Sequence, residues 1–394
     1  MEDLLIWAAE QGVSIGSVEP RCSAASGWGL FASDSSDGFR PGETILKVPR
    51  RLVLTVQNAV GAEPYRGALQ RHPRLLTATE ALCLFLCRER LLGAESKWQP
   101  YLRALPRSFD TVVERSQFPD QLLPLDGRRL LDNQREEIRR GAEKTAVVAK
   151  SLPPLEQLTD ELYLWAWNCV NTRCVYVEHD MAPLDYIDDR DGDTTALVPL
   201  FDLLNHAPDS QNVPYFVKQE GAFVLQAGRT VAPGGQVFVC YGPHSNTRLL
   251  LEYGFVVDDN PNNVVQLSTD ELLECAQRLG LGSSEQHAEI LNLSRLKFCL
   301  YEAQETIPWS TMATVAILSM DQTELADWKR IYRAADFDDP AVSMNAASII
   351  SLLMKDFRLR LSECAGDQKE LLQIWSEKIS ILEASLNCLA RDDD

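Results

Sequence analysis

The sequence predicts an α+β fold in which two strand-rich segments are separated by a long helical insertion and followed by a helical C-terminal region. Short runs of β-branched and aromatic residues, bounded by Gly and Pro, occupy residues 15–60 and 195–258. Helix-capping sequences and apolar residues at helical spacing follow each of these segments. The chain has 394 residues, 45% hydrophobic and 24% charged, which indicates a folded protein of two or three modules.

The first strand-rich segment gives way to helices at about residue 77. Within it, residues 45–49 and 52–55 are predicted strands, each bounded by turn signals. Thr77 and Glu80 form a capping box, in which hydroxyl and carboxylate satisfy free backbone amides before an apolar run. Residues 128–150 place apolar residues among many charges, which is typical of a partly solvated helix.

The second strand-rich segment contains two further predicted strands. Residues 222–226 and 236–241 are rich in Val, Phe and Leu, and a Pro-Gly-Gly sequence at 233–235 predicts a turn that joins them. Beyond this segment the pattern is helical to about residue 388, with capping boxes predicted at 268–271 and 283–286. The expected order is therefore strands, helical insertion, strands and a helical C-terminal region.

Charge, apolar runs and cysteine spacing each exclude a class of protein. With 38 basic and 57 acidic residues the formal net charge is −19, which argues against a protein that binds nucleic-acid backbones. No run approaches the roughly 18 apolar residues of a membrane span, and the acidic start predicts no secretory signal. The ten cysteines lack the paired spacings of a zinc site, so we expect reduced thiols, no metal, and a cytoplasmic or nuclear protein.

Three polar clusters interrupt otherwise apolar or strand-like sequence. The first is the segment 26–30, where Gly27 and Gly29 flank Trp28 and would let a ligand approach the backbone; a tight turn is an equal alternative. The second places Asn205 and His206 after an apolar run, although a single histidine is more often structural. The third begins at Tyr241, which ends a predicted strand and would project its hydroxyl beyond the sheet, unless it simply packs in a surface loop.

Taken together and in this order, these clusters resemble the SET-domain methyltransferases, specifically the Rubisco large-subunit methyltransferase type, which lacks zinc-bound cysteines. The resemblance is carried by five motifs, at residues 165–167, 170–173, 203–206, 237–244 and 248–255. It covers about residues 26–56 and 160–260 in detail. It implies a SET-domain β fold with a knot-like crossing, a helical insertion and an all-α C-terminal substrate-binding domain.

The resemblance also implies a division of the chain. The N-terminal part of the SET domain would occupy residues 1–60, the helical insertion 61–190, the C-terminal part with the active site 191–258, and the helical substrate-binding domain 259–394. The implied cofactor is S-adenosyl-L-methionine, and the implied reaction is methyl transfer to a lysine side chain of a protein. Methyl transfer of this kind depends on alignment and desolvation, so the sequence needs no evident acid/base pair.

Site residues carry over position by position from the same resemblance. The cofactor would contact seven residues: Ser26, Gly27, Trp28, Arg173, Asn205, His206 and Tyr241. Arg173 would pair with the methionine carboxylate, for which its planar donor fork is suited. Tyr241 would be the catalytic residue at the methyl-transfer centre. Substrate would be bound by Asp202, Tyr253 and Phe255, although Tyr253 follows Tyr241 at a spacing one residue shorter than expected of the plant enzyme.

The expected partner is a protein substrate, and a basic one such as a histone tail or another Lys-rich segment fits the acidic charge of the chain. We expect no direct contact with nucleic acid or membrane, and a monomer. Two alternatives remain open at this point. One is methylation of a histidine, as in a related branch of the family; the other is an interaction protein that keeps the fold with little catalysis.

Overall fold

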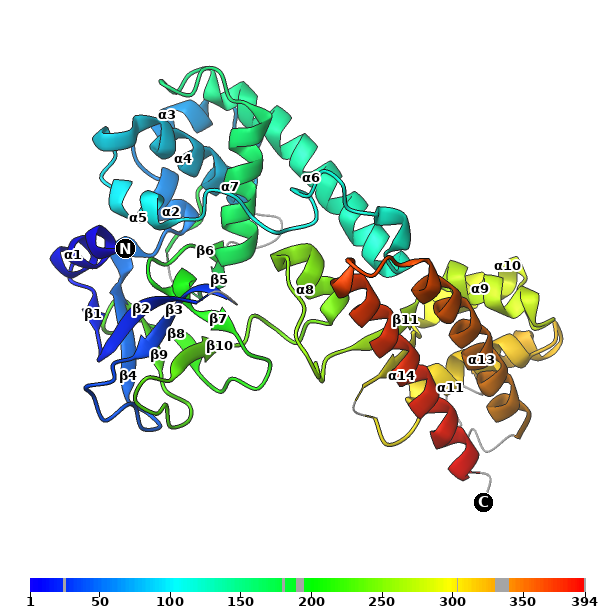
Figure 1. Cartoon of the computed structure of the whole chain (residues 1–394). Helices are drawn as coiled ribbons and strands as arrows, with labels where there is room; N and C mark the ends of the chain where they lie inside the picture. Colours follow the sequence, from blue (N-terminus) through cyan, green and yellow to red (C-terminus); the bar gives the residue numbers. More distant parts are fainter. Residues whose placement is uncertain (24–25, 179–180, 189–194, 303, 330–339, 393–394) are drawn as a thin grey trace. The chain divides into compact units, whose positions relative to one another are not determined.

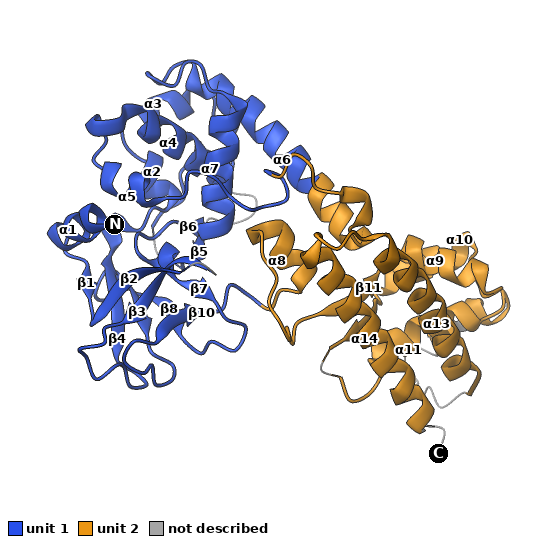
Figure 2. Cartoon of the chain, in the orientation of Figure 1, with its two compact units in different colours: residues 1–114, 133–242 blue, residues 115–132, 243–394 orange. Residues whose placement is uncertain are grey.

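A computed structural model describes the chain except for residues 24–25, 179–180, 189–194, 303, 330–339 and 393–394 (Figure 1). The chain divides into two compact units, coloured separately in Figure 2. Unit 1 comprises residues 1–114 and 133–242, and unit 2 comprises residues 115–132 and 243–394. Each unit has its own apolar core of buried residues. The four-part division expected from the sequence stays a prediction.

Unit 1 contains a four-stranded antiparallel sheet in the order β1-β4-β9-β8. The central strand β9 reads Ala-Phe-Val-Leu-Gln, and its first four residues are buried, as expected of a strand covered on both faces. The predicted strand at 45–49 is confirmed as part of β4. The bounds are β1 (Ser14–Ile15), β4 (Thr44–Pro49), β8 (Val213–Val217) and β9 (Ala222–Gln226).

A second four-stranded sheet of unit 1 has the order β2-β3-β10-β7. Its strands are antiparallel except for β10 and β7, which run parallel and pair Phe238 with Asn205 and Val239 with His206. The bounds are β2 (Val18–Ser23), β3 (Gly27–Ala32), β7 (Asn205–His206) and β10 (Gln236–Val239). The knot-like crossing stays a prediction, since strand pairing alone does not trace it.

Two expectations about strands are wrong. Strands β9 and β10 both form, but they pair in different sheets and not with each other across the turn at 233–235. Residues 52–55 do not form a strand, because Leu54 makes just an isolated bridge to Leu197. The hydroxyl of Thr55 instead accepts from Asn58 and caps helix α2 (Val56–Val60).

The helical insertion of unit 1 contains the predicted helix after the Thr77 capping box, α4, in which both capping hydrogen bonds form. Cys83 and Cys87 on α4 are fully buried thiols, and burial raises the pKa of each. The predicted solvated helix at 128–150 is confirmed as α6. The helical elements of this part of the chain, in order, are α1 (Glu2–Glu10), η1 (Arg50–Leu52), α2, α3 (Tyr65–Gln70), α4 (Ala78–Leu92), η2 (Gly93–Glu95), α5 (Gln99–Ala104), η3 (Asp120–Leu122), α6 (Leu125–Ala149) and α7 (Asp160–Arg173).

Three shorter elements complete unit 1. The strands β5 (Val175–Tyr176) and β6 (Thr195–Ala196) pair with each other, and a 3₁₀ turn, η4 (Phe201–Leu203), precedes β7. Helix α6 passes through the boundary between the units, because its residues up to 132 belong to unit 2 and those from 133 to unit 1.

Unit 2 is helical apart from a two-stranded sheet, β11 with β12. The capping box at 268–271 is confirmed, whereas the one predicted at 283–286 lies one residue further along, with Ser284 as the cap and His287 as its partner. Besides η3 and the start of α6, its described elements are α8 (Asn246–Tyr253), β11 (Val264–Leu267), α9 (Thr269–Arg278), α10 (Glu285–Ser294), β12 (Phe298–Tyr301), α11 (Trp309–Ser319), η5 (Glu324–Asp327), α13 (Pro340–Glu363) and α14 (Lys369–Asp392). No helix among the described residues is long and apolar enough to span a membrane.

Candidate functional site

Tyr241 is fixed by two hydrogen bonds just after strand β10. Its hydroxyl donates to the carbonyl oxygen of Leu204 at 2.7 Å, and its backbone N–H donates to Nδ1 of His206 at 3.1 Å. The rings of Tyr241 and His206 lie 5.2 Å apart. Strand β7 makes this arrangement possible, because its parallel pairing with β10 brings segments more than thirty residues apart in sequence side by side. The chain therefore holds the Tyr241 ring and hydroxyl at a defined place.

Strand β3 places Trp28 in the same sheet. Asn205 donates from Nδ2 to the carbonyl oxygen of Trp28 at 3.3 Å, and the Trp28 residue is 44% exposed. Gly27 has a φ of +66°, and a Cβ there would meet no atom within 4 Å. A Cβ on Gly29 would instead meet the side chains of Asn205, at 2.9 Å, and Gln236. Gly27 thus leaves an open backbone, whereas Gly29 makes room for protein side chains.

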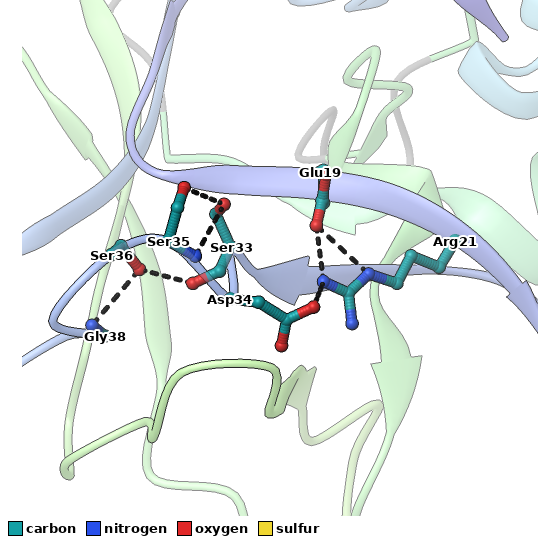
Figure 3. A network of polar contacts seen from close by, with 7 residues as sticks. All are labelled: Glu19, Arg21, Ser33, Asp34, Ser35, Ser36 and Gly38. Carbon is teal, nitrogen blue, oxygen red and sulfur yellow. Dashed lines mark hydrogen bonds and ion pairs between the residues drawn. The ribbon is translucent and has the colours of Figure 1, made fainter.

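Ser26 is exposed and is held by Ser23, and its predicted contact with the cofactor stays a prediction. Its hydroxyl lies 2.8 Å from the hydroxyl of Ser23, and its backbone N–H donates to the same oxygen at 3.0 Å. The other end of the β2–β3 hairpin is held by a separate polar network, drawn in Figure 3. There Arg21 bridges Glu19 and Asp34, with 2.7 Å between Nη2 of Arg21 and Oδ2 of Asp34. Both ends of the hairpin that carries Trp28 are therefore tied by side chains.

Arg173 ends helix α7, and its charge acts on the buried carboxyl of Asp202. Arg173 is the last residue of that helix, where a cation is favoured by the helix dipole, and its guanidinium lies 5.1 Å from the centre of the Phe109 ring. Asp202 lies on η4. Burial raises the pKa of the Asp202 carboxyl to about 6, although the positive charge of Arg173 opposes the increase. Unit 1 therefore contains a cation and, within reach of its charge, a carboxyl with a raised pKa.

Tyr253 and Phe255 belong to unit 2, whereas the other predicted site residues belong to unit 1. They form an aromatic group with His244, with ring centres 6.3 Å apart for His244 and Tyr253 and 6.1 Å apart for Tyr253 and Phe255. Arg115 donates to the carbonyl oxygen of Gly254 at 3.1 Å and pairs with Glu370 at 3.0 Å. The structure thus gathers these aromatic residues within unit 2 and the remaining site residues within unit 1.

Sequence reasoning missed three contributors to these clusters. Tyr101 is fully buried, and the negative charge of Asp202 adds to burial in raising its pKa. Nε2 of Gln236 is buried and makes no hydrogen bond to the described part of the chain. Arg115 holds the backbone between Tyr253 and Phe255. None of them belongs to a local motif, so no signal in the sequence could have singled them out.

The residues of unit 1 fit a cofactor that carries a carboxylate and polar edges. Arg173 supplies a cation, Gly27 an open stretch of backbone, and Gln236 a buried donor that a ligand could satisfy. Among the described residues, no group of three or more His, Cys, Asp or Glu side chains could hold a metal ion.

Residues 27–242 match the SET domain, and the chain belongs to the SET-domain family. The chain is 27% identical to human SET domain-containing protein 4 over 98% of this chain and 90% of that protein. It is 24% identical to the protein of the same name from Artemia parthenogenetica, over 99% of this chain and 96% of that one. Mouse actin-histidine N-methyltransferase is 26% identical over 92% of this chain, but the match spans 62% of that protein.

Solved structures support the fold. The crystal structure of the SET domain of LSMT bound to lysine and AdoHcy matches all of this chain and 89% of that chain, with a TM-score of 0.62 and 19% identity. The structure of Rubisco LSMT bound to AdoMet gives a TM-score of 0.61 with 90% of that chain covered. The expected SET-domain fold is therefore confirmed, and SET methyltransferases use S-adenosylmethionine.

Proposed function

We propose that this protein is an S-adenosylmethionine-dependent protein-lysine N-methyltransferase. The observation that carries the proposal is the pair of hydrogen bonds that fix Tyr241 beside His206 and Leu204, in a chain of the SET-domain family. The neighbouring LSMT structures, which bind lysine or methyllysine together with AdoHcy, favour lysine as the target. We further propose that it acts on a protein substrate in the cytosol or nucleus.

Five groups of unit 1 would hold the cofactor. Arg173 would pair with its carboxylate, because a guanidinium offers two parallel donors to two oxygens. The backbone of Gly27 and the exposed Trp28 would border it on one side, and Asn205 and His206 on the other. When bound, S-adenosylmethionine supplies an electrophilic methyl group for an in-line displacement.

The side chain of Tyr241 would orient the acceptor amine. A free lysine has a pKa near 10.4 and is protonated at neutral pH, yet it reacts as a neutral amine. Apolar surroundings disfavour the ammonium form and lower that pKa. The Tyr241 hydroxyl bonds the backbone of Leu204, a buried residue, and an apolar environment at this point would have that effect. The ammonium proton would leave to solvent water before the displacement, and alignment by well-placed groups can contribute about 7–11 kcal/mol to the transfer itself.

Histidine is a second candidate target, because the chain also resembles actin-histidine N-methyltransferase. An imidazole has a pKa near 6.5 and needs less help to become neutral. We would incubate the protein with a cell lysate and labelled S-adenosylmethionine, and locate the label by mass spectrometry. We expect methyllysine. Labelled histidine with unmodified lysine would overturn the lysine assignment, while leaving the methyltransferase class intact.

Calorimetric titration tests the cofactor site directly. We expect wild type to bind S-adenosylmethionine, and Arg173→Gln to bind it at least tenfold more weakly, because one charge-assisted pair is lost. Arg139→Gln is the matched control, since Arg139 is an exposed arginine paired with Glu136 and Glu143 on α6. Absence of binding by wild type at millimolar cofactor would favour the alternative of an interaction protein without turnover.

A further inference from the structure

A pocket of about 190 Å³ opens in the helical insertion of unit 1, outside the cluster around Tyr241. It is bordered by the end of α4, by α5 and the residues just after it, and by Trp165 on α7. Trp165 is 5% exposed, and its indole N–H donates to the carbonyl oxygen of Pro106 at 2.8 Å. The indole is therefore a fixed wall of the pocket.

Three arginines line this pocket: Arg90, Arg103 and Arg107. The guanidinium carbon of Arg90 lies 3.9 Å from the centre of a Trp165 ring, a cation–π stack. Stacking uses the face of the guanidinium and leaves its N–H donors, which lie at the edge, for a planar oxyanion. Arg103 pairs with Asp3 at 3.8 Å, but both side chains are exposed, so that pair is weak.

Glu89, the carboxylate among the described residues of the pocket wall, is already compensated. Glu89 accepts from the hydroxyl of Tyr65 at 2.6 Å and from that of Ser96 at 2.5 Å, and it lies 3.6 Å from Arg88. Its charge therefore does not neutralise the three arginines of the pocket. A cluster of positive charge on a chain of net charge −19 marks a local site for an anion.

We propose that this arginine pocket binds a carboxylate side chain of an acidic segment on a partner protein. Its volume is below the roughly 300–1,000 Å³ of small-molecule pockets and equals that of about six waters, which suits the end of one side chain. The acidic surface elsewhere on the chain repels such a segment, so binding is directed to this pocket. The proposal is independent of methyl transfer.

Fluorescence anisotropy with labelled hexaglutamate at low ionic strength tests the pocket. We expect saturable binding, which the double variant Arg90→Gln with Arg107→Gln weakens at least tenfold. The charge-matched control is Arg139→Gln with Arg140→Gln, on exposed residues that pair with Glu136. Because all four positions are exposed, these variants are expected to fold.

Three results would overturn the proposal. The first is equal weakening in the control pair, which would make the attraction a diffuse effect of charge. The second is unchanged binding in the Arg90 and Arg107 variant. The third is displacement of the peptide by inorganic phosphate at concentrations no higher than those of unlabelled hexaglutamate, which would make the pocket a site for small anions. Arg90→Lys keeps the charge without the planar fork, and we expect at least threefold weaker binding from it.

Discussion

The two units hold their candidate site residues by different means. In unit 1, the parallel pairing of β7 with β10 places Asn205 and His206 beside Tyr241, and hydrogen bonds to Trp28, His206 and Leu204 add to that placement. In unit 2, the segment between α8 and β11 belongs to no helix or strand, and side chains hold it, because Asn246 donates to and accepts from the backbone of Val257 and also donates to Glu377. Strand pairing sets the geometry in unit 1, whereas a few polar side chains set it in unit 2.

Because of this difference, we expect side-chain substitutions in unit 1 to affect mainly activity and those in unit 2 to affect mainly stability. The geometry of unit 1 follows the main chain, so replacing one functional side chain should remove its chemistry and leave the scaffold in place. In unit 2, removing one polar side chain leaves buried partners without hydrogen bonds, which destabilises the unit itself. The following predictions test this contrast, beginning with the largest expected effect.

Tyr241→Phe should reduce methyl transfer at least 100-fold while S-adenosylmethionine affinity changes less than threefold. The substitution removes the hydroxyl at the proposed transfer centre and one hydrogen bond to Leu204, but not the β7–β10 pairing. Transfer of labelled methyl groups and calorimetry would measure the two quantities. The control is Tyr215→Phe on β8, a 40% exposed tyrosine that should keep full activity. Equal activity of both variants would remove Tyr241 from the proposed mechanism.

Glu377→Ala should lower the free energy of unfolding by about 3 kcal/mol, because several buried partners lose an acceptor. Its carboxylate accepts from Asn246 and Gln373 at 2.9 Å and from Asn263 at 2.8 Å. Urea denaturation followed by circular dichroism would measure the change, and hydrogen exchange should show it in α8 and α14. Glu383→Ala removes a half-exposed ion pair from the same helix and should cost less than about 1 kcal/mol.

Asp202→Asn should stabilise the fold at pH 7.5 by on the order of 3 kcal/mol and change it little near pH 4. The folded carboxyl has a pKa of about 6 against an ordinary 3.8, so the folded state holds its proton more tightly. Ionisation therefore destabilises the native protein as the pH rises from about 4 to 6. Asp209→Asn should act in the opposite direction, because Arg229 lowers the pKa of that exposed carboxyl. Thermal unfolding of wild type and Asp202→Asn between pH 4 and 7.5 would measure this effect. A stability difference between the two proteins that does not vary with pH would contradict the raised pKa of Asp202.

Gly29→Ala should weaken S-adenosylmethionine binding severalfold and destabilise unit 1 by about 1–2 kcal/mol. The added methyl group meets the side chains of Asn205 and Gln236, so it displaces the bond from Asn205 to Trp28. Calorimetry and thermal unfolding would record both effects. Gly366→Ala is the control, since a Cβ there meets nothing within 4 Å. An unchanged cofactor affinity would show that the position of Asn205 does not matter for binding.

The local sequence was sufficient for several elements. The Thr77–Glu80 and Ser268–Glu271 capping boxes form as predicted, because both groups of each box lie within one turn. The partner of β10 could not be inferred in the same way. Its turn residues favoured a hairpin with β9, yet β10 pairs with β3 and β7, since long-range burial outweighs a local turn preference.

For the candidate site as well, the sequence predicted some residues, and the structure alone revealed others. The order of its motifs placed Asn205, His206 and Tyr241 in one predicted site, and the structure brings these three together. Their contacts with Leu204 and Trp28 involve backbone groups, which every residue carries, so no residue type in the sequence marks them. The sequence likewise could not predict the roles of Arg115 and Tyr101. Each interacts with a residue distant in sequence, Arg115 with Gly254 and Tyr101 with Asp202.

By itself the sequence determined the α+β class, the family resemblance, the helix starts and the negative charge of this protein. These depend on composition and on residues within a few positions of each other. The tertiary structure alone decided which strands pair, which glycine makes room for Asn205, and that Arg90, Arg103 and Arg107 line one pocket together with Trp165. Such features depend on contacts between distant residues, whose energies no local pattern encodes.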